Sequence, residues 1–155
     1  MTKNLPLYIK LSVFFGTIIG IILGILMTIP IIQLFAIFIF FAVGSIVMFL
    51  LKKNNISDGF QTKDGVIVGG ISGFCSAISA SIVFLILALI VGSIFSGTYD
   101  MIKAFFMSFS SVVVLLILIF CIAFMNMIFN MGSALLVLSL YGKVQKAEFK
   151  VEKSE

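Results

Sequence analysis

The sequence predicts an all-α integral membrane protein, a four-helix bundle with glycine-zipper packing. Three observations carry this prediction: the composition, the length of the apolar runs and the distribution of lysine. Of the 155 residues, 62% are hydrophobic and only 10% are charged, whereas a soluble domain averages about 45–50% apolar and about 25% charged residues. A single membrane domain, residues 1–155, is expected, because the hydrophobic residues form runs long enough to cross a bilayer.

The first two spans are predicted over residues 11–29 and 31–51. As a helix rising about 1.5 Å per residue, the first run would reach about 28 Å, close to the thickness of the hydrocarbon core. The run is too long for the apolar part of a signal peptide and no small-residue cleavage site follows it, so an uncleaved span is expected. Pro30 is expected to end the first helix, and the short uncharged connection predicts a tight antiparallel hairpin.

The third span is predicted over residues 66–95, after a polar loop at residues 52–65. Two Asp-Gly pairs in this loop favour tight turns. The loop lacks the alternating oxygen ligands and the final glutamate of an EF-hand, so no calcium site is expected there.

The apolar segment at residues 102–141 is too long for one crossing, because as a single helix it would extend about 60 Å, twice the hydrocarbon thickness. Two divisions are open. In one, residues 101–110 lie at the membrane interface and the fourth span covers residues 111–141. In the other, the helix breaks near residues 126–132 and crosses twice.

The distribution of lysine distinguishes these two alternatives. With four spans, the N-terminal segment, the polar loop and the tail at residues 142–155 share one side, which then holds every lysine except Lys103. Five spans would divide the ten lysines equally. Because lysine-rich loops stay in the cytoplasm, we expect four spans in the cell membrane with both termini cytoplasmic.

Glycine spacing is the sharpest pattern in the sequence. In the first span and again in the third, three glycines stand four residues apart, so each set shares one helix face. Such faces let neighbouring backbones approach closely, which favours helix packing in lipid. A second small-residue face on the third span predicts that this helix lies at the centre of the bundle. The predicted packing residues are Gly16, Gly20, Gly24, Gly65, Gly69 and Gly73, with Ser72, Ser76 and Ser79 continuing the seam of Gly65 and Gly69.

Polar side chains inside the spans are the candidates for a functional site. Asn126 and Asn130 stand four residues apart, and Gln33 is the strongly polar residue of the second span. Because an unbonded amide is costly in hydrocarbon, these side chains either clamp neighbouring helices or line a polar pathway. The serines of the third span leave the same choice open, between bonds to helix carbonyls and a pathway.

The residue inventory argues against catalysis. The chain contains no histidine, which titrates near neutral pH and is the commonest metal ligand, and its six acids fall in connecting or terminal segments. Cys75 and Cys121 stand alone in apolar runs, as small buried hydrophobes do. We therefore expect no enzyme activity, no metal and no cofactor. The lysine excess indicates membrane topology rather than nucleic-acid binding.

The passage DGFQTKDGVIVGGISGFCSAI, residues 58–78, resembles the central stretch of a small archaeal membrane-protein family that is classed as a domain of unknown function. Members of that family look like four-helix proteins with a polar loop after the second span and a glycine-rich third span. Asp64, Gly65, Gly69 and Gly73 occupy the family pattern here. The resemblance implies a location and an architecture, and no activity.

The expected function is non-enzymatic: an accessory or assembly subunit, or a self-associating helical bundle. Its expected partners are the lipid bilayer and either further copies of the chain or another membrane protein. The alternative is a small channel or facilitator for a neutral or weakly polar solute. Such a pathway would require Ser72, Ser76, Asn126 and Asn130 to converge on a water-accessible cavity, which separates the two hypotheses.

Overall fold

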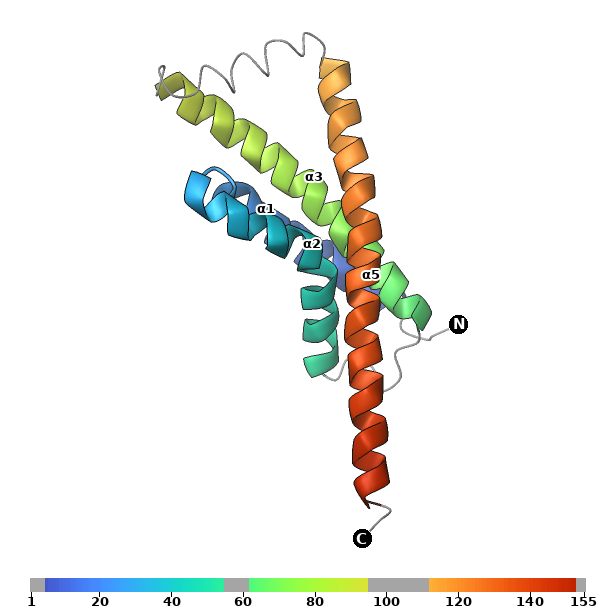
Figure 1. Ribbon diagram of the computed structural model, residues 1–155. Coiled ribbons are helices and arrows are strands. Elements are labelled where there is room, and N and C mark those ends of the chain that lie inside the picture. Colours follow the sequence, from blue (N-terminus) through green and yellow to red (C-terminus); the bar gives the residue numbers. More distant parts are fainter. Residues whose placement is uncertain (1–4, 55–61, 95–111, 153–155) are drawn as a thin grey trace.

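The computed structural model describes residues 5–54, 62–94 and 112–152, and these ranges form four helices and contain no strand. The helices are α1 (Leu5–Leu26), α2 (Pro30–Lys53), α3 (Thr62–Ile94) and α5 (Val112–Glu152) (Figure 1). Each contains a stretch long and apolar enough to cross a membrane. The predicted all-α architecture with four spans is therefore confirmed, and the chain is a multi-pass membrane protein. A break within the last apolar segment is excluded, because α5 runs continuously through residues 126–132.

α3 is the central helix of the bundle. It packs against the other three helices, whereas α1 and α5 make no contact with each other within the described ranges. Gly16 of α1 lies against Ser72 of α3, and one turn later Gly20 lies against Ser76. Because both numbers increase together, α1 and α3 run parallel.

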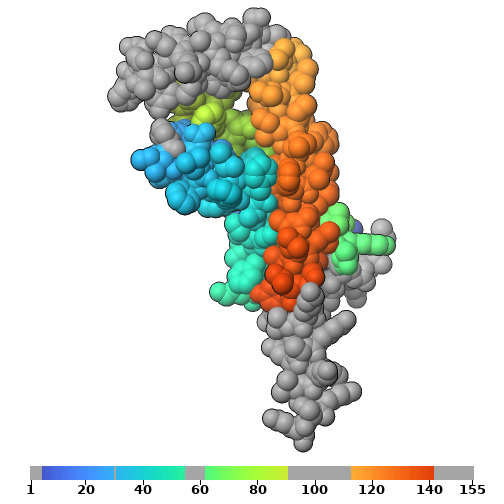
Figure 2. Space-filling model, viewed as in Figure 1, coloured from blue at the N-terminus to red at the C-terminus, as the bar shows by residue number. Residues whose placement is uncertain are grey.

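α2 and α5 also run parallel to each other. The ring centroids of Phe41 and Phe129 lie 5.0 Å apart, and further along both helices those of Phe49 and Tyr141 lie 6.2 Å apart. Figure 2 shows α5 lying against α2 on the face in view. The four helices therefore alternate in direction, as four successive membrane crossings require.

Every charged residue in the described ranges lies at one end of the bundle. This end holds the starts of α1 and α3 and the ends of α2 and α5. There the Nζ atom of Lys52 lies 4.1 Å from the ring centroid of Tyr141, a cation–π contact that joins α2 to α5. The charged positions at this end are Lys10, Lys52, Lys53, Lys63, Asp64, Lys143, Lys146, Glu148, Lys150 and Glu152.

Several element boundaries differ from those expected. α1 already begins at Leu5, because the side chain of Lys10 is exposed and does not interrupt the helix. Pro30 does not end α1, which stops at Leu26, but occupies the first turn of α2, where its missing N–H is not needed. α5 extends through Glu152, so the helix continues into the tail at residues 142–155. The interfacial segment expected at residues 101–110 lies outside the described residues.

Close backbone approach, rather than interlocking side chains, defines the contact between α1 and α3. A Cβ atom added to Gly16 would lie 2.8 Å from the Cα of Ser72, and one added to Gly20 would lie 2.7 Å from the Cα of Ser76. Cβ atoms are essentially never found within 3.0 Å of another heavy atom, so a side chain at either position would force the two backbones apart. Helices that meet through such faces gain dispersion contacts that lipid chains cannot supply.

We predict that Gly20→Ala destabilises the protein, whereas Gly132→Ala does not. Nothing lies within 4 Å of a Cβ added to Gly132 on α5, so alanine there gains helix propensity, up to about 1 kcal/mol. At Gly20 the two backbones must separate, and overpacking of this kind costs about 1–3 kcal/mol. Unfolding of both variants in detergent measures the difference. Equal stability of the two variants would count against glycine-dependent packing of α1.

A buried asparagine pair as the candidate functional site

Asn126 and Asn130 lie one helical turn apart on a buried row of α5. The row continues with Ala123 on one side and Ala134 on the other, and all four residues are buried. The small alanine side chains at the two ends of the row let α5 approach α2 and α3. The amides of Asn126 and Asn130, in the middle of the row, then reach the backbones of these two helices. The exposed fractions are 1% for Asn126 and 0% for Asn130.

The side chain of Asn130 binds both polar groups of one turn of α2. Its Oδ1 atom accepts a hydrogen bond from the backbone N–H of Gly44 at 2.5 Å, and its Nδ2 atom donates to the carbonyl oxygen of Phe40 at 3.2 Å. A Cβ atom on Gly44 would lie 3.1 Å from the Cβ of Asn130 and would collide with the carbonyl oxygen of Asn130. The absence of a side chain at residue 44 is therefore what admits the amide to the backbone of α2.

α2 changes direction part-way along its length (Figure 1), and two features at Gly44 favour a bend. Its first half runs beside α1 and α3, and its second half runs beside α5 (Figure 1). Sharp bends in helices occur at Gly-Ser pairs and where a foreign group engages the backbone hydrogen-bond ladder. Gly44 and Ser45 form such a Gly-Ser pair, and the side chain of Asn130 is the foreign group that bonds to the backbone N–H of Gly44.

Asn126 makes the corresponding contact with α3. Its Nδ2 atom donates to the carbonyl oxygen of Gly73 at 2.8 Å and to the Oγ atom of Ser76 at 3.3 Å. The Nδ2 atom of Asn130 in turn lies 2.9 Å from the Oδ1 atom of Asn126 and 2.8 Å from its backbone carbonyl oxygen. The two amides thus form one hydrogen-bonded unit that joins α5 to α2 and to α3.

The serines of α3 bond mainly to carbonyl oxygens of their own helix. Ser72 donates to Gly69 at 3.3 Å and Ser76 to Gly73 at 2.9 Å. Ser79 donates to its own helix at Cys75, 2.8 Å away, and its Oγ atom also lies 3.3 Å from the carbonyl oxygen of Thr17 in α1. Bonds of this kind satisfy the hydroxyl groups in hydrocarbon without water.

The predicted seam of α3 is divided between two neighbouring helices. Gly65 and Gly69 lie against α5, whereas Ser72 and Ser79 lie against α1. The glycines at residues 65, 69 and 73 all face α5, because that helix crosses α3 obliquely (Figure 1) and follows a row of residues spaced four apart. On the other face of α3, Gly24 of α1 lies against Ala80 and Val83, one turn beyond the contact of Gly20. The two glycine rows therefore do not meet each other.

Gln33 does not join the asparagine pair. α2 meets Asn130 at Gly44, and Gln33 lies about 16 Å nearer the start of α2 at the rise of an α-helix. Its side chain is exposed in the first turns of α2, near the end of the bundle that lacks described charges.

The sequence pattern did not reveal the partners of Asn130 on α2. Phe40 and Gly44 take part through backbone atoms, which no residue pattern reports. The Gly-Ser pair at residues 44–45 was the available signal, since such pairs mark bends in helices.

The asparagine pair forms bonds that hold neighbouring helices together. The side chains of the pair are uncharged amides with partners on α2, α3 and α5. Within the ranges that the structure describes, no three His, Cys, Asp or Glu residues come close enough to hold a metal ion. Cys75 and Cys121 are free thiols, the first partly buried on α3 and the second exposed on α5.

Comparison of the chain with protein-family models, with curated proteins and with solved structures finds no match. Fold and site thus define the class of a four-helix multi-pass membrane protein with a buried polar clamp. The resemblance of residues 58–78 to an archaeal family stays a prediction.

We predict that Asn130→Ala lowers the free energy of unfolding by about 1–2 kcal/mol, because single bonds between membrane helices contribute about 0.6 kcal/mol on average and up to about 1.7 kcal/mol. The matched control is Ser139→Ala, an exposed polar residue on the same helix, for which a change within about 0.5 kcal/mol is expected. Denaturant titration in micelles measures both. Should the two variants unfold alike, the amide does not clamp α2.

Proposed function

We propose that the chain is a non-enzymatic membrane protein that acts through helix packing, as an accessory or assembly subunit of a membrane complex or as a self-associating bundle. The observation that carries the proposal is the use of the polar side chains inside the spans. Ser72, Ser76, Asn126 and Asn130 are each between 0% and 1% exposed. Each of them bonds to a helix backbone.

The alternative, a channel or facilitator for a neutral solute, uses the same residues differently. A solute pathway needs polar groups that exchange their bonds with water or solute as it passes. Here the amides and hydroxyls converge on each other, and their bonds lie between packed helices rather than along a wetted surface. This arrangement favours the packing role over the channel.

The outer surface supports a role within the membrane plane. Large apolar side chains are exposed on all four helices, among them Phe14, Phe38, Ile86 and Leu136. This surface is available to lipid or to other membrane helices.

We predict that the tagged protein, extracted in a mild detergent, appears in native mass spectra as a defined complex, either with a second membrane protein or with further copies of itself.

In liposomes the protein should leave the permeability to glycerol and urea at the level of empty vesicles. A monomer that accelerates solute flux would contradict the proposal, above all if Asn126→Leu abolishes the flux and Ser139→Leu does not.

We also propose that the charged end of the bundle faces the cytoplasm, because lysine-rich ends are retained there. In a variant whose two native cysteines are replaced by alanine, Asn54→Cys at the end of α2 should react with a membrane-impermeant maleimide only after the cells are opened. Ile29→Cys, in the turn between α1 and α2 at the opposite end, should react in intact cells. The reverse pattern would invert the topology.

A further inference from the structure

α1 has two faces of opposite character. Its inner face carries Gly16, Gly20 and Gly24 and lies against α3. Its outer face carries bulky side chains, including Phe14, whose exposed fraction is 58%. Since α5 does not reach α1 within the described ranges, that helix does not cover this outer face.

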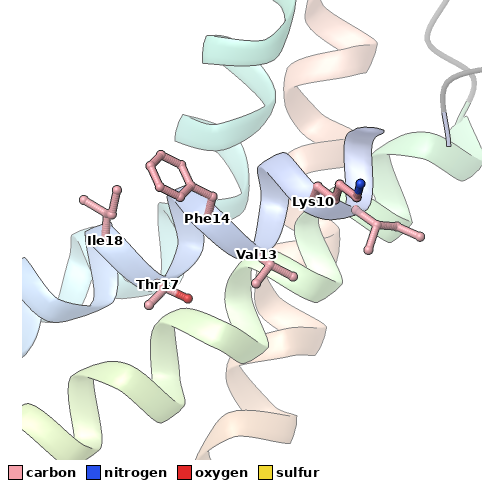
Figure 3. Close-up of a pocket in the computed structure, with 6 residues that line it drawn as sticks. Lys10, Val13, Phe14, Thr17 and Ile18 are labelled. Carbon is pink, nitrogen blue, oxygen red and sulfur yellow. The ribbon is translucent and has the colours of Figure 1, made fainter. Parts of the chain in front are cut away.

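The outer face forms a hollow of about 500 Å³ (Figure 3). Phe14 and Ile18 stand on one side of it, Val13 and Thr17 stand on the other, and Lys10 lies at the end nearest the start of α1. The two sides are adjacent rows of residues spaced four apart, with Ile9 completing one row and Lys10 the other. The hollow is therefore apolar along its length, with a single positive charge at one end.

We propose that this hollow binds one anionic phospholipid, with an acyl chain between the two rows and the phosphate at the ammonium group of Lys10. The dimensions fit one leaflet, because Lys10 and Ile18 are about 12 Å apart along the helix and half of the hydrocarbon core is about 15 Å thick.

The side chains favour a lipid chain over a second protein helix as the occupant. Helices dock in membranes through small residues that allow backbones to approach, and on α1 those residues face α3. A flexible acyl chain can follow the uneven surface between a phenylalanine and an isoleucine.

The charge at the end of the hollow selects an anionic headgroup. Lys10 is exposed, and the other side chains that line the hollow are uncharged. A phosphate at Lys10 therefore meets a positive charge, and long basic side chains near a membrane surface attract anionic lipids.

The absence of tryptophan from the chain provides a direct test. In the full-length variant Phe14→Trp, a single fluorophore stands at the side of the hollow, and its exposed position keeps the substitution out of the core. Lipids with brominated acyl chains quench tryptophan on contact. In mixed vesicles, brominated phosphatidylglycerol should compete for this position about fivefold better than brominated phosphatidylcholine, the preference expected for one lysine near the surface.

Lys10→Gln in the same background should reduce this preference to about onefold, whereas the control Lys53→Gln, an exposed lysine on α2 outside the hollow, should leave it unchanged. Equal quenching by the two lipids in the parent variant would overturn the headgroup assignment. A tryptophan that neither lipid quenches would overturn the lipid site altogether, because another helix or a second copy of the chain must then cover the hollow.

Discussion

The contact between the Asn130 amide and the backbone of α2 is the interaction on which the arrangement of the bundle depends. Hydrocarbon offers no hydrogen bonds, so the amide must find its partners within the protein. It finds them at Gly44 and Phe40, one turn of a neighbouring helix. Because Asn126 bonds to both Asn130 and α3, the position of α5 relative to α2 and α3 is fixed by one connected set of bonds.

Glycine makes this set of bonds possible and also explains the central place of α3. At Gly44 and Gly69, atoms of Asn130 occupy the space that a side chain would need. On the other face of α3, the glycines of α1 admit the backbone around Ser72 and Ser76. At these positions a glycine on one helix meets a small polar residue on its neighbour. Where that residue is an asparagine, its amide reaches the backbone of the glycine-bearing helix, so that close packing and hydrogen bonding reinforce each other.

Much of this architecture could be predicted from the sequence, and the physical reasons are plain. Bilayer thickness sets the length of each apolar run, so the four spans were predictable. The distribution of lysine argued against a helix break at residues 126–132, and α5 is continuous there. The pairing of faces was not predictable. Gly65 and Ser72 lie within one helical pattern, yet they meet different helices, because the crossing direction of α5 is a property of the assembled bundle. The role of Gly44 was not predictable either, because it contributes a backbone N–H. Gln33 is equally polar but exposed, so polarity alone does not identify a member of the site.

The central position of α3 has a consequence for how the protein is made. α1 and α2 leave the ribosome first, but they contact each other less than α1 contacts α3. The glycine face of α1 therefore has its partner only after residues 72–83 have entered the membrane, and Asn130 reaches Gly44 later still. Until then the first hairpin lacks most of the interhelical contacts of the finished bundle, and the asparagine bonds form only after the last helix is inserted. A chain truncated before α5 would leave the backbone of α2 without the amide that bonds to it.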